Sequence, residues 1–179
     1  MEIIQSNKSQ LSTNWVENLA LEELNMDEAG IVNFNDHLDI NFILEEASIH
    51  FMNQLRDAFD FYITKFNEFR GGPNSGAQIK TFKISNTVND FMLFRNSLRL
   101  IFARKSNDLV IISLIVNGKD LYAPRASTDD INDYQSEGHE IKAHVGPFSR
   151  VSWRFQGEKV SILPMVRHYL SEFIRNSAR

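Results

Sequence analysis

The stretch EEASIHFMNQLRDAFDFYITKFNEF, residues 45–69, decides the fold. Its apolar residues recur alternately every three and every four positions, which is the pattern of an α-helix with one apolar stripe. Phe51, Ala58 and Phe61 widen the stripe on one flank. A stripe this broad has to be covered, so we expect the helix to pack on a sheet of its own domain or, as the alternative, against a second copy of itself. The stripe consists of Met52, Leu55, Phe59, Tyr62, Phe66 and Phe69.

The helix should end at GGPNSGA, residues 71–77, because its glycines relax the backbone at a helix end and Pro73 cannot continue the helix. The charge also changes sign here. Residues 1–72 hold 4 Lys+Arg against 13 Asp+Glu, a net of −9, and residues 73–179 hold 15 against 10, a net of +5. We expect one domain, residues 1–179, in which a loop at 71–76 joins an acidic helical part, 1–70, to a basic β-rich part, 77–179. The asymmetry indicates attraction between the halves or an acidic partner for the second half.

The second half reads as strands, at 78–84, 90–104, 109–117, 139–145 and around 149–160. Residues 90–104 allow one long strand, two strands that turn at Asn96–Ser97, or a helix. We favour a strand because a tight turn at 105–108 and a β-branched run follow. A two-residue turn at Gly157–Glu158 would place Phe155 opposite Val160.

The remaining elements complete an α+β fold. A short helix is expected at 11–24, capped by Ser12 or Thr13, and a C-terminal helix at about 163–176. Residues 31–34 and 38–44 read as a strand pair, with a helix beginning near Asp36 as the rival. We therefore predict an antiparallel sheet of five to seven strands, packed against the helix at 45–69 and the C-terminal helix at 163–176.

Composition and motifs narrow the function classes. The chain has no cysteine, which excludes disulfides, thiolate metal sites and cysteine nucleophiles. The first ten residues lack the pattern of a secretory signal, and the longest apolar run, 109–116, is far shorter than the ~20 residues of a membrane span. We therefore expect a cytoplasmic protein without a membrane partner.

No motif supports catalysis, a metal site or a cofactor. His139 and His144 are spaced so that they cannot share a metal on either a helix or a strand. His168 and Glu172 can touch on the last helix, but no second half of an acid–base or metal site is visible. We assign no catalytic residue, and enzymatic activity stays open.

A candidate binding surface comes from SRVSWRFQGEKV, residues 149–160. As a strand it directs Val151, Trp153 and Phe155 to one face, and arginines to the other. If 90–104 is one long strand of the same sheet, its arginines join them on the outer face. A fork of guanidinium N–H groups suits carboxylate or phosphate. The first interpretation is an ordinary solvated sheet face, with docking of an acidic partner second. Nucleic acid is disfavoured because the pI is about 5.7. The predicted anion-binding or partner-binding residues are Arg95, Arg99, Arg150 and Arg154.

The leading functional hypothesis is a non-catalytic interaction, adaptor or chaperone-like domain that forms a homodimer through the aromatic helix. The order of elements and the acidic balance resemble those of small dimeric bacterial secretion chaperones, but no residue motif carries that likeness and no site is transferred from it. The alternative is a small anionic-ligand binding protein or enzyme, with residues 118–138 as a lid over the arginine face. The predicted self-association face comprises Phe51, Phe59, Tyr62 and Phe66.

Overall fold

The computed structural model describes residues 12–31, 39–123 and 138–178, which belong to two compact units, Met1–Asp39 and Ile40–Arg179. The first unit contains helix α2, Asn14–Ala29, where a helix was expected. The helix ends at Gly30, whose left-handed backbone directs its N–H to the Met26 carbonyl at 2.9 Å. None of the α2 residues is buried, including the apolar Val16 and Leu19.

The second unit begins with the long helix α3, Ile40–Phe69. The prediction of a strand at 38–44 is therefore wrong from Ile40 onward, while its first two residues and the partner strand fall largely outside the described range. No glycine or proline interrupts residues 31–69, so a helix extends over the short apolar alternation at no nucleation cost. Asp39 stands directly before the first helical turn, a position where aspartate is favoured.

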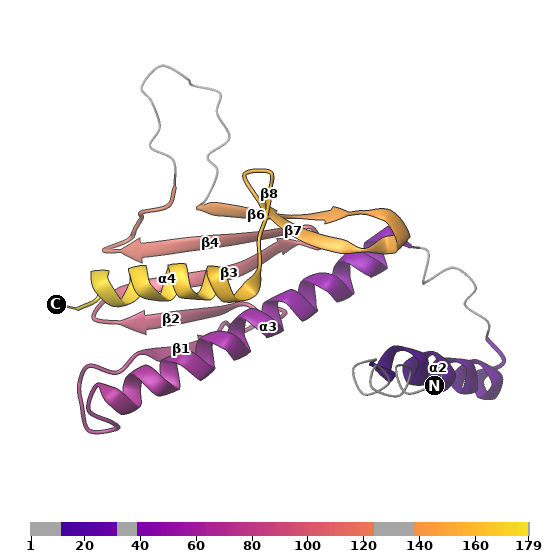
Figure 1. Cartoon of the computed structure of the whole chain (residues 1–179), viewed down its shortest axis with the longest axis horizontal. Coiled ribbons are helices and arrows are strands. Elements are labelled where there is room, and N and C mark those ends of the chain that lie inside the picture. The colour runs from indigo at the N-terminus through magenta and orange to yellow at the C-terminus, as the bar shows by residue number, and fades with distance from the viewer. Residues whose placement is uncertain (1–11, 32–38, 124–137, 179) are drawn as a thin grey trace, which may run out of the picture. The chain divides into compact units, whose positions relative to one another are not determined.

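An eight-stranded antiparallel sheet follows, so the predicted α+β class is confirmed (Figure 1). The strand order is β1-β2-β3-β4-β6-β7-β8, with β5 paired to β4 beyond this path. The sheet has one strand more than the upper limit of the predicted five to seven. The count includes two very short strands, β5 and β8, of two residues each. The C-terminal helix α4, Ile162–Asn176, agrees with the expected 163–176. The strands are β1 Lys80–Lys83, β2 Phe91–Arg95, β3 Leu98–Ser106, β4 Leu109–Val116, β5 Lys119–Asp120, β6 His139–Val145, β7 Val151–Phe155 and β8 Glu158–Lys159.

Residues 90–104 form two strands. Asn96 and Ser97 take the turn with φ of 48° and 68°, so that Arg95 of β2 stands opposite Leu98 of β3. The expectation of strand rather than helix is confirmed, and of the two strand alternatives the structure has the pair that turns at Asn96–Ser97. The two-residue turn reverses the chain and restarts the alternation, which moves Arg95 to the same face as Leu98.

Helices α3 and α4 lie together on one face of the sheet, here called the inner face (Figure 1). Phe59 of α3 contacts Phe91 and Phe102, with ring centroids 6.1 and 5.0 Å away, and Phe51 stacks on Trp153 at 4.4 Å. The helix stripe is thus covered by the sheet of its own unit. None of the helices in the described ranges is long and apolar enough to cross a membrane.

The heptad stripe is not buried along its whole length. At 100° per residue, Tyr62 lies about 60° and Phe69 about 80° from Phe59 around the helix, whereas Ile63 lies only about 40° away. Accordingly Ile63 is buried, Tyr62 is 42% exposed and Phe69 is 92% exposed. In a straight helix, residues seven positions apart do not stay on one line but shift by about 20° around the axis. The last residues of the stripe therefore lie outside the face that the sheet covers.

Two loops hold the edges of the sheet. Asn67 donates to the Ile79 carbonyl at 3.0 Å and accepts from its N–H at 2.9 Å, which ties the 71–77 loop back onto α3. At the other edge the β7–β8 turn consists of Gln156 and Gly157, with Phe155 opposite Glu158. The predicted pairing of Phe155 with Val160 is wrong, because the turn is one residue earlier than the predicted Gly157–Glu158.

Candidate functional site

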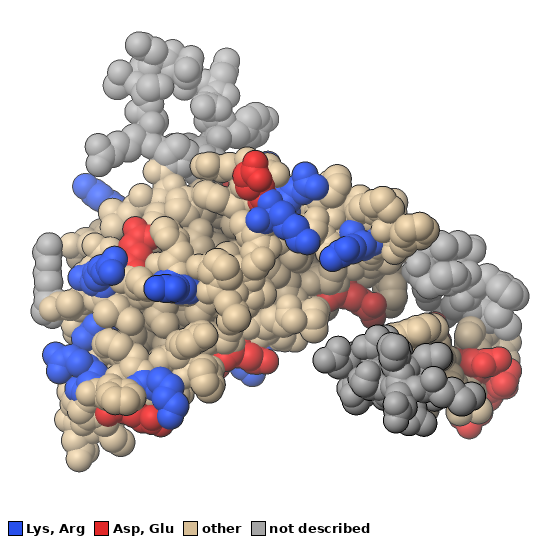
Figure 2. All heavy atoms as spheres, in the orientation of Figure 1, with Lys and Arg blue, Asp and Glu red and all other residues tan. Residues whose placement is uncertain are grey.

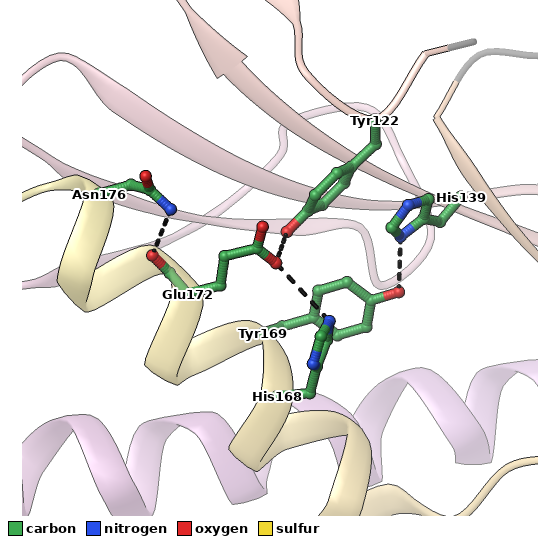
Figure 3. A network of polar contacts seen from close by, with 6 residues as sticks. All are labelled: Tyr122, His139, His168, Tyr169, Glu172 and Asn176. Carbon is green, nitrogen blue, oxygen red and sulfur yellow. Dashed lines mark hydrogen bonds and ion pairs between the residues drawn. The ribbon is translucent and has the colours of Figure 1, made fainter.

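A cluster of aromatic and polar side chains connects β5 and β6 to α4 (Figure 3). The rings of Tyr122 and His139 stack with centroids 4.0 Å apart and 12° between their planes. The Tyr122 hydroxyl donates to Glu172 Oε2 at 2.7 Å, and His139 Nδ1 is 3.0 Å from the Tyr169 hydroxyl. His168 Nε2 lies 3.6 Å from the same Glu172 oxygen. The predicted contact between His168 and Glu172 is therefore present, but it is one edge of a larger cluster.

Local backbone structure positions Tyr122. Asp120 accepts hydrogen bonds from the backbone N–H groups of Leu114 and Tyr122, at 3.1 and 2.9 Å, and so fixes the turn after β5. The Leu121 N–H also donates to the Leu114 carbonyl at 2.8 Å. An aspartate that bonds the backbone two residues on is a common way to hold a turn.

Gly138 positions His139. It has φ of +79°, and a Cβ placed on it would lie 2.4 Å from the Ile112 carbonyl oxygen. Only glycine permits this approach of β6 to β4, which places His139 opposite Ile112 in the ladder. Residues 124–137, most of the segment predicted as a lid, lie outside the described residues.

Burial controls the protonation of the cluster. Burial, and next the neighbouring Glu172 carboxylate, raise the pKa of both Tyr122 and Tyr169 above the ordinary tyrosine range. Burial lowers the pKa of His139, and its effect exceeds the opposing influence of Glu172. At neutral pH the tyrosines are therefore protonated donors and His139 is a neutral ring. The cluster is a hydrogen-bonded aromatic wall, and in residues 12–31, 39–123 and 138–178 no three metal-ligating side chains come together.

The four predicted arginines do not gather on one face. Arg95 is on the inner face and only 4% exposed, with its Nη1 3.4 Å from Ser177 Oγ and its guanidinium 5.3 Å from the centre of the Phe66 ring. Burial lowers the pKa of Arg95, with the nearby Arg70 as a second cause. Asn96 beside it donates to the Ser177 carbonyl at 2.7 Å. Arg95 thus helps to hold the end of α4, where the helix dipole favours a cation, and it is not displayed to a partner.

Of the other three arginines, Arg99 lies far from Arg154. Arg99 pairs with Ile115 of β4, whereas Arg154 pairs with Lys142, which in turn pairs with Leu109 of β4. Arg99 and Arg154 are therefore separated by about 14 Å across the strands and about 20 Å along them, from standard sheet spacings. Arg150 is exposed, in the connection before β7. Binding roles for Arg99, Arg150 and Arg154 stay predictions, without the shared patch that motivated them. Figure 2 likewise shows Lys and Arg dispersed over the visible face of the 40–179 unit.

The predicted self-association residues of α3 divide into two groups. Phe51 and Phe59 are buried against the sheet, and Phe66 lies beneath Arg95. Tyr62 is 42% exposed. A dimer formed through Phe51 and Phe59 would require the unit to open, because these rings already fill its core.

The sheet face opposite the helices carries an apolar surface that the sequence patterns did not indicate. Strand alternation and register direct its members away from the buried inner residues Leu93, Leu100 and Leu114. The sequence did not indicate these residues because β2 and β4 carry apolar residues on both faces, so apolar and polar residues do not alternate clearly along them. We call this surface the outer apolar face; it comprises Phe82, Met92, Phe94, Ile101, Ile111 and Ile115.

No protein-family model, curated protein or solved structure matches this chain. The functional argument therefore depends on its own residues.

Proposed function

We propose that residues 40–179 form a protein-interaction domain that self-associates by packing the outer apolar face of one copy on that of another. The observation that carries the proposal is the apolar character of the outer face of β2 and β4, which Ile101 and Ala103 continue on β3. The segment LVIISLIV of β4 has only Ser113 as a polar residue. Strands buried on both faces read as nearly continuous apolar runs, whereas strands with one solvated face alternate.

The covering of the sheet supports the same proposal. In the described part of the 40–179 unit, α3 and α4 both contribute to the inner-face core. The outer residues Met92, Phe94 and Ile101 stay partly exposed, and Phe82 is 42% exposed. Its ring meets Phe94 at 6.5 Å, so that two aromatic rings lie together on this face. Arg99 is exposed between Phe94 and Ile115 and interrupts this surface. An apolar surface rimmed by polar residues on the outside of a sheet marks an interaction site.

The size of the surface suits a weak dimer. Strands β1 to β4 contain 4, 5, 9 and 8 residues, so at about 3.3 Å per residue and about 4.8 Å between strands they present roughly 400 Å². Two copies would bury about 800 Å² in total, which is at the small end of interfaces and fits weak, transient self-association. Packing two sheets face to face at about 10 Å is a standard arrangement for apolar strand faces. This proposal moves self-association from the buried α3 residues to the sheet.

Analytical ultracentrifugation over a concentration series tests the proposal. The test variant is Phe94→Lys, at the centre of the outer apolar face, and the matched control is Phe69→Lys, on an exposed phenylalanine at the end of α3. We expect the parent and the control to dimerise, and Phe94→Lys to weaken dimerisation by at least about tenfold, since a buried lysine costs more than 1.4 kcal/mol.

A monomeric parent across the series would refute self-association, and so would equal dimerisation of the two lysine variants. Far-ultraviolet circular dichroism of Phe94→Lys must match that of the parent, because a partly unfolded variant would lose the dimer for another reason. An adaptor role and a cytoplasmic location remain parts of the proposal.

A further inference from the structure

A hollow of about 650 Å³ lies beside the aromatic cluster, where β6 and β7 pair. Its lining includes Tyr122 and His139 together with three basic residues of β6 and β7, Lys142, His144 and Arg154. This volume is within the range of pockets that hold small molecules. The hollow lies on the β6–β7 half of the sheet, whereas the outer apolar face lies on β1–β4.

Basic side chains stand directly opposite each other beside the hollow, and their repulsion lowers the stability of the strand pairs. Lys142 stands directly opposite Arg154 in the β6–β7 register, and Arg154 has Lys159 opposite it on β8. Like charges placed directly opposite each other destabilise a strand pair. An anion bound between them would remove this repulsion.

The two cations differ in how far they are neutralised. Lys142 Nζ forms an ion pair with Glu140 Oε2 at 2.9 Å. The Arg154 side chain has no ion pair or hydrogen bond with any other described residue, and its Nε is enclosed without a partner. An unpaired guanidinium lining a hollow is a natural receptor for an oxyanion, because its planar fork matches two oxygens at once.

Strand alternation divides the lining between the two faces of the sheet. Lys142 and Arg154 project from the outer face, because their neighbours Ile141 and Trp153 are buried on the inner face. His139 and Phe155 point to the inner face, where their ring centroids lie 5.2 Å apart and His139 Nδ1 is 3.0 Å from the Tyr169 hydroxyl. The cationic part of the hollow is therefore formed by the outer face of β6 and β7.

We infer that the hollow binds the oxyanionic group, carboxylate or phosphate, of a small molecule, with Arg154 as the principal contact and Lys142 as the second. The inference does not depend on the proposed self-association, because neither arginine variant used below alters the apolar residues of the outer face.

Thermal unfolding of the full chain with inorganic phosphate, acetate or chloride at equal ionic strength tests this inference, together with ¹H–¹³C spectra of the histidine rings. The test variant is Arg154→Gln, which removes the charge and keeps a polar side chain. The matched control is Arg167→Gln, an exposed arginine on α4 that does not line the hollow. We expect phosphate or acetate to raise the unfolding midpoint of the parent and the control and to shift the His144 resonances. Arg154→Gln should weaken this binding at least about tenfold.

The outcomes separate the ligand classes. A larger effect of phosphate indicates a phosphate-bearing ligand, and a larger effect of acetate a carboxylate. Arg154→Gln should unfold at or above the parent midpoint without ligand, because the repulsion from Lys142 is relieved, so lost binding would not reflect misfolding. Equal effects of chloride and both oxyanions, or undiminished binding by Arg154→Gln, would overturn the inference.

Discussion

Replacing Gly138 by alanine tests the local geometry that builds the aromatic cluster. The matched control is Gly157→Ala in the β7–β8 turn. Both glycines have positive φ, +79° and +86°, so both replacements place an alanine in the left-handed region. They differ in space: the added Cβ at 157 meets nothing within 4 Å, whereas at 138 it lies 2.4 Å from the Ile112 carbonyl oxygen and 2.9 Å from Ser113 Oγ.

The two costs can be estimated separately. The left-handed conformation costs an alanine about 1 kcal/mol, and this is the whole expected effect of Gly157→Ala. At 138 the Cβ must also move from 2.4 Å to at least 3.0 Å from the carbonyl oxygen, so the start of β6 must shift by 0.6 Å or more from β4. Overpacking of this kind costs about 2 kcal/mol. We therefore expect a loss of about 3 kcal/mol for Gly138→Ala.

Urea unfolding of the two variants and the parent provides the measurement. Gly138→Ala should also weaken the near-ultraviolet circular dichroism of the tyrosines, because a shifted His139 no longer stacks on Tyr122. Equal free energies of unfolding for the two alanine variants would show that β6 does not approach β4 as closely as described. The account of how His139 is positioned would then be wrong.

Three further predictions concern the turn, the pH dependence and the core. Ser97→Gly should raise the free energy of unfolding by about 0.5–1 kcal/mol in urea titrations, because glycine adopts the observed φ of 68° without strain; a loss would contradict the turn assignment. Burial lowers the pKa of His139, so it contributes stability above the ordinary histidine pKa near 6.5 that is lost as the pH falls through the lower folded value. Urea titrations at about pH 7.5 and about pH 5 should thus show a smaller decrease in stability for His139→Phe than for the parent, and an equal decrease would refute this role. Phe51→Ala should cost about 3–4 kcal/mol and Tyr62→Ala under about 1 kcal/mol, since only the first ring is buried; similar costs would contradict the helix orientation.

The candidate cluster could be predicted only in part. The spacing of His168 and Glu172 on one helix is a local signal, and their contact is present. Tyr122, His139 and Tyr169 come from three separate parts of the chain, and no local pattern links them. Gly138 offered a weak signal, since a lone glycine before a strand can mark a close backbone approach.

The sequence by itself determined the α+β class, the long helix, the strand-rich second half and the apolar stripe, because helix and strand periodicities are properties of neighbouring residues. It did not determine the inner location of Arg95 or the apolar character of the outer face. Both depend on one two-residue turn at Asn96–Ser97, since a reversal restarts the alternation and changes which side chains share a face. Only the tertiary structure decided where the charges and the exposed apolar residues lie, because that depends on strand register and on which face α3 and α4 cover.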